Sequence, residues 1–380
     1  MIRLVVLAVV FVIIGVPGSV YAQVLPEEKS EGTMQSVYPI VGFSSDIGWF
    51  GGGIYQRINY DDGVDPFLSN TIADLTGSTN GKWSAMFEYE RIRMLNRPLR
   101  TKSSIEIDRD PIYNFFGIGN NSEFSGSGFD EGIYYLMQKQ VAGTFEIRSP
   151  LSIFSNVNRV DGIVRLALSY TENEDNGGDT PFFTDQPMGS DGGIIASAGL
   201  GLVYDRRNSE FDPRSGIRAE IGADFTPSAA INDYGFSKYY AELKSYTKLI
   251  EDVIFAQKLS ATYSYGSTPF YELPALGNKN GLRGFAMNRY LGDHSVLYMA
   301  EVRSWIFRFF HDEIKIGGHA FYDTGRVFSD TDTPRFLESW KRTIGVGGAM
   351  SAFTSDLIFR GEIGFSEETY RIYAGVGFAF

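Results

Sequence analysis

The residues from Ala275 to Asp293, ALGNKNGLRGFAMNRYLGD, combine spaced glycines with basic side chains in a chain whose net charge is −12. Glycines that allow tight turns beside a cation are typical of loops that bind phosphate. This stretch lacks the Gly-Lys-Ser/Thr ending of a P-loop, and no helical pattern follows to direct a helix dipole at an anion. Phosphate binding is therefore not the explanation of this stretch.

Residues with catalytic or metal-binding chemistry are scattered. The chain has no cysteine, which excludes a disulfide framework, a Cys-ligated zinc and a thiol nucleophile. The three histidines, His294, His311 and His319, do not form a metal motif such as H-E-x-x-H. No Ser/His/Asp set stands at suggestive positions, and SGSG at 125–128 has no nucleophile-elbow context. We predict that the protein is not an enzyme and uses no metal or cofactor.

The composition indicates many strands and turns. Glycine occurs 43 times, phenylalanine 30 times and tyrosine 22 times, without a collagen or linker period. The net charge of −12 argues against a nucleic-acid partner, which would need a basic surface.

The N-terminus has the pattern of a secretory signal peptide. Arg3 precedes an apolar run from Leu4 to Val16, and Val20-Tyr21-Ala22 resembles a cleavage site. The alternative is a single membrane anchor, but the run is shorter than the roughly 20 residues that a span needs. We predict a signal peptide at 1–22, a flexible periplasmic lead-in at 23–34 and one barrel domain at 35–380.

Most of the remaining chain alternates apolar and polar residues with a period of two, which predicts strands. Several of these segments run about ten residues or longer, the length that a tilted strand needs to cross a bilayer. The last segment places one apolar face at Tyr370, Ile372, Ala374, Val376, Phe378 and Phe380. Only residues 333–342 have a helical pattern. A strand in lipid cannot leave its backbone unpaired, so the strands must close into a barrel.

We predict an all-β fold, a sixteen-stranded antiparallel transmembrane β-barrel, and the even number fits bacterial outer-membrane barrels. The predicted strands are 35–44, 48–60, 66–76, 82–92, 98–108, 132–149, 156–171, 193–205, 215–226, 235–249, 253–265, 295–306, 313–323, 343–352, 356–365 and 369–380.

The lengths of the connections support this count. The long connections, 109–131, 172–192, 266–294 and 324–342, all follow odd-numbered strands. Such barrels have long extracellular loops and short periplasmic turns. Both termini should therefore be periplasmic, and the stretch 275–293 belongs to the sixth extracellular loop.

Two consecutive strands place carboxylates on the face that should point into the lumen. In 295–306, Glu301 shares a face with Leu297, Met299, Arg303 and Trp305, and the opposite face suits lipid. In 313–323, Asp323 shares the polar face with Lys315 and His319.

The chain resembles the BamA/TamA-like bacterial surface antigen family. The most specific motif is GLRGF, which is similar to the family's (V/I)-R-G-(F/Y) signature on the sixth extracellular loop; a second, AFYDTGRVF, matches F-x-D-x-G. The segment from Val203 to Glu220 and the segment from Asn114 to Asn120 are also similar. The residues that carry the two main motifs and the C-terminal barrel signal are Gly281, Leu282, Arg283, Gly284, Phe285, Phe321, Asp323, Gly325, Tyr370, Phe378 and Phe380.

The resemblance implies an outer-membrane barrel whose sixth loop folds inward, where Arg283 pairs with Asp323, near Glu301. It implies outer-membrane lipid and the barrel-assembly machinery as partners for its own insertion, and an unfolded outer-membrane or secreted protein as client. Full assembly factors of the family carry periplasmic POTRA domains, for which the lead-in has no room, so we expect a barrel-only relative. A passive channel or structural barrel without insertase activity remains the alternative.

Overall fold

The computed structural model describes residues 32–61, 64, 66–94, 97–151, 160–277, 281–310, 314–329, 338–352 and 358–380. The predicted signal peptide, residues 23–31 of the predicted lead-in, and His311 lie outside these residues. Among the described residues, no helix is long and apolar enough to cross a membrane.

The strands and helices have the following bounds: β1 (Gly32–Ser44), β2 (Gly48–Tyr60), β3 (Ser69–Ser78), β4 (Trp83–Arg91), β5 (Arg100–Asn114), α1 (Gly126–Glu131), β6 (Tyr135–Pro150), β7 (Asp161–Asp175), α2 (Pro181–Asp185), β8 (Gly193–Asp205), β9 (Gly216–Thr226), β10 (Phe236–Ile250), β11 (Val253–Gly266), the 3₁₀ helix η2 (Phe270–Glu272), β12 (Ala275–Leu276), β13 (Tyr290–Leu291), β14 (His294–Phe309), β15 (Ile314–Phe328), β16 (Lys341–Ala352), β17 (Ile358–Phe365) and β18 (Tyr370–Val376).

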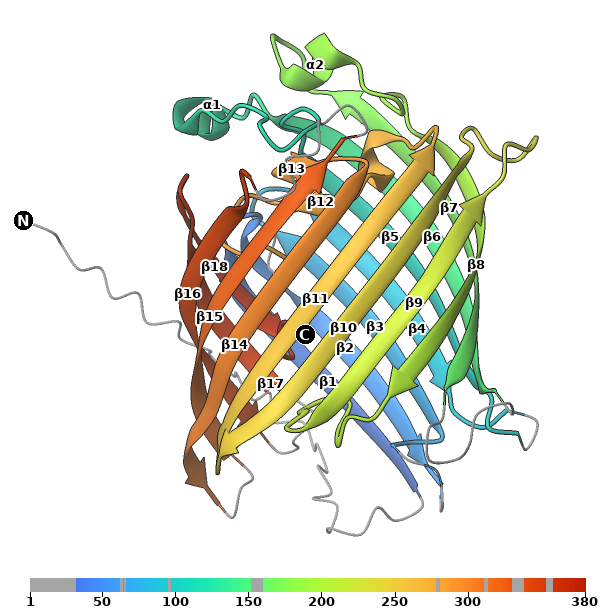
Figure 1. Cartoon of the computed structure of the whole chain (residues 1–380), viewed down its shortest axis with the longest axis vertical. Helices are drawn as coiled ribbons and strands as arrows, with labels where there is room; N and C mark the ends of the chain where they lie inside the picture. The colour runs from blue at the N-terminus through green and yellow to red at the C-terminus, as the bar shows by residue number, and fades with distance from the viewer. Residues whose placement is uncertain are drawn as a thin grey trace, which may run out of the picture.

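Sixteen of these strands form one antiparallel sheet, in which each strand pairs with its neighbours in chain order. The strands tilt around a common axis and enclose a lumen (Figure 1). The predicted count of sixteen is confirmed, and 48–60 and 193–205 have the predicted bounds. The first strand begins at Gly32, inside the predicted lead-in. The two-residue strands β12 and β13, which the sequence did not predict, pair with each other inside a loop.

Alternation along each strand separates lipid-facing from lumen-facing side chains. On β7, Leu166 and Leu168 are 52% and 53% exposed on the outer surface. On β14, Val302 and Ile306 are exposed, whereas Glu301 and Arg303 are buried inside. An outer apolar band of this kind is what lets a barrel wall contact hydrocarbon, and the predicted faces of β14 and β15 are confirmed.

The long loops gather at one end of the barrel, together with α1 and α2 (Figure 1). The long loops of such barrels face the outside of the cell, so we assign this end as extracellular. The predicted helix at 333–342 is wrong in its described part, because Lys341 and Arg342 begin β16 and pair with β15; residues 333–337 lie outside the described residues.

The barrel has a seam between its first and last strands. Within the described residues, β1 and β18 share no strand ladder. At the extracellular end of the seam, Ser45, directly after β1, donates its amide to the carbonyl of Ile372 at 2.9 Å and accepts the Ile372 amide on Oγ at 2.9 Å. If the antiparallel pairing continued from Ser45 and Ile372 along both strands, Val376 would lie opposite Val41. Val376 is the last residue of β18, so residues 32–40 of β1 extend beyond the end of β18.

The last residues of the chain leave the wall and enter the lumen, which corrects the prediction of a strand over 369–380. Gly377 has a φ of 77°, a left-handed conformation that redirects the chain after Val376. The Phe378 ring then packs on Trp305 with centroids 6.0 Å apart, and the guanidinium of Arg303 lies 4.9 Å from the ring of Phe380. The mark for the C-terminus accordingly falls within the outline of the barrel (Figure 1).

Candidate functional site

The glycine-rich stretch of the sixth extracellular loop lies inside the barrel. We call residues 281–291 the buried segment, because Leu282, Arg283, Phe285, Tyr290 and Leu291 are at most 1% exposed. Its base is closed by the pairing of β12 with β13. These five side chains are therefore enclosed by protein rather than by solvent.

Arg283 makes its main contact with Asp323 on β15. Its Nε and Nη2 donate to the two carboxylate oxygens of Asp323 at 2.8 and 2.7 Å, and its backbone amide donates to the same carboxylate at 3.0 Å. The guanidinium carbon also lies 3.5 Å from the ring centroid of Phe321. A planar guanidinium that is both bidentate to a carboxylate and stacked on an aromatic ring has a fixed orientation.

Two further carboxylates complete the surroundings of Arg283. Its Nη1 donates to Glu301 on β14 and, at 3.2 Å, to Glu362 on β17. All four side chains are fully buried. Burial by itself would lower the pKa of Arg283, but the hydrogen bonds and charge of Asp323, with the two glutamates, raise it above its ordinary value. Arg283 is therefore a permanent cation that joins three strands of the wall.

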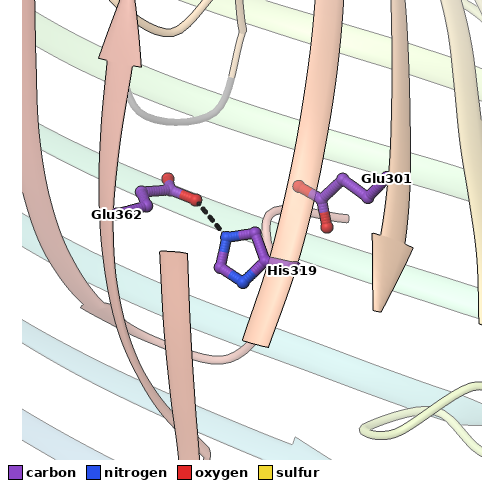
Figure 2. A group of neighbouring side chains, drawn as sticks. All are labelled: Glu301, His319 and Glu362. Carbon is purple, nitrogen blue, oxygen red and sulfur yellow. Dashed lines mark hydrogen bonds and ion pairs between the residues drawn. The ribbon is translucent and has the colours of Figure 1, made fainter. Parts of the chain in front are cut away.

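Three side chains near Arg283 lie close enough together to be considered as ligands of a metal ion. They are Glu301, His319 and Glu362. Figure 2 shows that His319 points toward Glu362, and its Nε2 lies 3.0 Å from that carboxylate. However, Arg303 donates to Glu301 at 2.7 Å, and Arg283 bonds both glutamates. A divalent cation would have to displace these arginines, so the residues fit an ion-pair network better than a metal centre.

Two glycines allow the backbone of the buried segment to contact the backbone of the barrel wall directly. Gly284 has a φ of 95°, and a Cβ added to it would lie 3.1 Å from the carbonyl carbon of Gly364 on β17. A Cβ on Gly364 would lie 2.9 Å from the amide nitrogen of Gly284. Across the same contact, the Tyr373 hydroxyl accepts from the Gly284 amide at 3.1 Å and donates to the Phe285 carbonyl at 3.2 Å. Glycine is therefore required on both sides.

The apolar residues of the motif pack against β14. Leu282 and Phe285 belong to one buried cluster with Leu297, Met299 and three other apolar residues. Leu282 has a φ of 62°, which is unfavourable for a leucine. Burial of its side chain offsets this backbone cost.

The structure therefore brings together most of the predicted site residues. Gly281, Leu282, Arg283, Gly284, Phe285, Glu301, Phe321, Asp323 and Gly325 all lie at the buried segment or on the wall that it contacts. Tyr370 is 59% exposed at the extracellular end of β18, away from this site. Phe378 and Phe380 lie in the lumen beside Arg303. The role of these three residues as a C-terminal barrel signal stays a prediction.

Several residues of the site were not predicted as such. Glu362 and Arg360 are the charged residues of the predicted strand at 356–365, but nothing in the sequence linked them to Arg283. Glu362 is a second inward carboxylate, but β16 separates its strand from that of Asp323, so adjacency in the sheet did not indicate the contact. Gly364 and Tyr373 had no sequence signal, because their role depends on a backbone contact across the lumen.

Comparison with known proteins agrees with this architecture. The Omp85 superfamily domain matches residues 72–380. The fold is similar to BamA from Haemophilus ducreyi lacking POTRA domains 1-3, at 13% identity and a TM-score of 0.59, covering 91% of this chain and 70% of that one. It is also similar to CdiB from Escherichia coli, at 13% identity and a TM-score of 0.59, covering 93% of this chain and 64% of that one. None of the curated proteins compared with this chain matches it.

At these identities, the solved structures establish the fold, and this chain spans about two thirds of their length. The family match covers most of the chain and includes the buried segment and the strands β14, β15, β17 and β18 that it contacts. The predicted family resemblance and the predicted outer-membrane location are confirmed. This chain belongs to the Omp85 superfamily and is an outer-membrane β-barrel.

Proposed function

We propose that this barrel inserts or translocates unfolded outer-membrane or secreted proteins, and that the client engages the seam between β1 and β18. In this proposal, the contact of Arg283 with Asp323 latches the buried segment inside the lumen. The solved BamA and CdiB structures have a similar fold, and the resemblance noted in the sequence implies the same class of activity.

The observation that carries the proposal is the incomplete seam. Residues 32–40 of β1 extend past the last residue of β18, so their backbone groups on that side have no counterpart on β18. A strand edge with free amides and carbonyls is a template for another strand. An unfolded barrel client has such strands to add.

The position of the buried segment gives the second support. Tyr373 of β18 bonds Gly284 and Phe285, and the amide of Met287 donates to Asp46, in the turn after β1, at 3.4 Å. The segment therefore contacts both sides of the seam at its extracellular end. A latch in this place would hold the two terminal strands together until a client opens the seam.

A passive channel is the second candidate, and one observation favours it. The lumen contains a cavity of about 300 Å³ lined by charged and polar side chains, including Lys82, Asp108 and Glu272. A hydrated interior of this kind suits the passage of small solutes.

Reconstitution into liposomes separates the two functions. We expect vesicles containing the barrel to accelerate the insertion of a urea-unfolded outer-membrane barrel, measured by the heat-modifiable mobility of that client. Vesicles containing an unrelated porin of similar size are the control. Steady single-channel conductance together with no acceleration would reject the insertion function in favour of the channel.

A further inference from the structure

A second arginine of the buried segment is almost completely enclosed. Arg289 is 2% exposed and lies on the extracellular side of Arg283, where it contacts other partners. Its Nη2 lies 2.7 Å from the carboxylate of Glu368, in the turn between β17 and β18. Its Nη1 donates to the Ser122 hydroxyl and its Nη2 to the Ser122 carbonyl, both at 2.7 Å. Arg289 thus joins three loops that are far apart in the sequence.

Aromatic rings surround the same guanidinium. The guanidinium carbon lies 5.0 Å from the ring centroid of Phe116, 5.4 Å from that of Phe124 and 4.5 Å from that of Tyr290. Tyr290 also donates its hydroxyl to Glu368 at 3.1 Å. Cations over aromatic faces are attracted more strongly where water is excluded. The site therefore contacts both the charge and the flat faces of the guanidinium.

Two of these rings and Ser122 belong to the loop between β5 and β6, residues 115–134. The loop runs beside β13, where the Gly119 amide donates to the Leu291 carbonyl at 2.7 Å. Its Asn120 accepts the Val327 amide at 3.2 Å and donates to the Ser339 carbonyl at 2.9 Å. These contacts lie on the opposite side of the sheet order from β5 and β6, so the loop crosses the extracellular mouth of the barrel.

The far part of this loop reaches the seam. It contains α1, which Figure 1 shows at the extracellular end above the terminal strands. The ring of Phe129 in α1 lies 4.6 Å from the guanidinium carbon of Arg371 on β18. Arg371 in turn contacts Asp46, beyond the end of β1, at 3.3 Å. The loop thus covers both the mouth and the extracellular end of the seam.

We propose that residues 115–134 form an extracellular lid, and that Arg289 is the positioning residue that holds this lid closed on the buried segment and on the terminal hairpin. Glu368 supplies the charge for this contact from the turn between β17 and β18. Movement of that hairpin at the seam withdraws Glu368 and releases the lid. This inference rests on the proposed function only for the movement of the terminal hairpin at the seam.

A single cysteine beneath the lid tests the inference, because the chain has no native cysteine. Ala286 is 1% exposed and packs with Phe116 and Tyr134 of the lid. In purified barrel carrying Ala286→Cys, we measure the rate of labelling by a hydrophilic maleimide. Adding Arg289→Ala should raise this rate by about tenfold or more, since loss of one partner of a buried, hydrogen-bonded charge pair is costly.

Three matched variants complete the experiment. Glu368→Gln should also accelerate labelling, because it removes the charge and keeps the shape. Arg289→Lys should give an intermediate rate, since an ammonium cannot bond Glu368 and Ser122 with a planar fork. Arg342→Ala removes an exposed cation from the same rim and should leave the rate unchanged.

The labelling assay contains no client, so its result does not depend on insertion activity. Heat-modifiable mobility of each variant establishes that the barrel is folded before labelling is compared. Equal labelling rates in folded Arg289→Ala and wild-type backgrounds would overturn the lid. Faster labelling in Arg289→Ala but not in Glu368→Gln would overturn the role of the terminal hairpin.

Discussion

Within the buried segment, Arg283 makes ionic contacts with three carboxylates of the barrel wall. It is fully buried and bonds Asp323, Glu301 and Glu362 on three different strands. Removal of one partner from a buried ionic network leaves uncompensated charge, at a cost of about 3–5 kcal/mol. We predict that Arg283→Ala releases the buried segment, lowers the temperature at which heat-modifiable mobility is lost and exposes the segment to protease.

A lysine at the same position separates charge from geometry. Arg283→Lys keeps the cation but lacks the planar fork that bonds both oxygens of Asp323 and stacks on Phe321. It should recover only part of the lost stability. Wild-type protease resistance in Arg283→Ala would show that this arginine does not hold the segment.

The contact between Gly284 and Gly364 supports a second prediction at the residue scale. Gly364→Ala would place a Cβ 2.9 Å from the amide nitrogen of Gly284, which cannot move without displacing the segment. Gly375→Ala on the adjacent strand is the matched control, because its Cβ would lie 3.8 Å from the nearest heavy atom, the tip of Arg360. We expect limited proteolysis to cut within 281–291 faster in Gly364→Ala only. Equal cutting in the two variants would refute the requirement for glycine at Gly364.

At the scale of elements, the periplasmic turn between β8 and β9 is tied to the start of β5. Arg100 donates to both carboxylate oxygens of Glu210 in that turn, at 2.8 and 3.1 Å. Burial by itself would raise the pKa of Glu210, but the hydrogen bonds and charge of Arg100 outweigh it and lower the pKa. The turn therefore gains stability from the ionised form of Glu210.

The sign of this shift predicts an acid sensitivity. A lowered folded-state pKa contributes stability above the unfolded value of about 4.3, and this stability is lost as the pH falls through the folded pKa. The difference in thermal stability between wild type and Glu210→Gln should thus be largest near neutral pH and shrink below about pH 4. Glu251→Gln, an exposed carboxylate in the next periplasmic turn, is the control. A difference that persists unchanged at low pH would contradict the prediction.

The strands could be predicted from the sequence, whereas the small elements within the loops could not. Alternation with a period of two is a local property, so it located β8 without error and β14 to within a few residues. The pairing of β12 with β13 and the short helices α1 and α2 depend on contacts with the wall and the neighbouring loops. The final strand was predicted too long because its alternation continues through Phe380, although Gly377 turns the chain into the lumen.

At the scale of the molecule, the seam is the feature that can be tested by covalent closure. Ser45 and Ile372 exchange hydrogen bonds across it, and no other cysteine would compete with a pair placed there. We predict that a disulfide between Ser45→Cys and Ile372→Cys abolishes client insertion, and that reduction restores it. The barrel with either single cysteine is the control. Full insertion activity in the oxidised, cross-linked barrel would show that the client does not use the seam.

The sequence by itself determined the class of fold, the number of wall strands and the inward direction of Glu301 and Asp323. It could do so because a bilayer imposes the same alternation on every strand, and each strand records it locally. The tertiary structure alone decided that Glu362 joins Arg283, that the chain ends inside the lumen and that the loop at 115–134 crosses to the seam. These features join residues that are distant in the chain, and their contacts exist only once the barrel has closed around them.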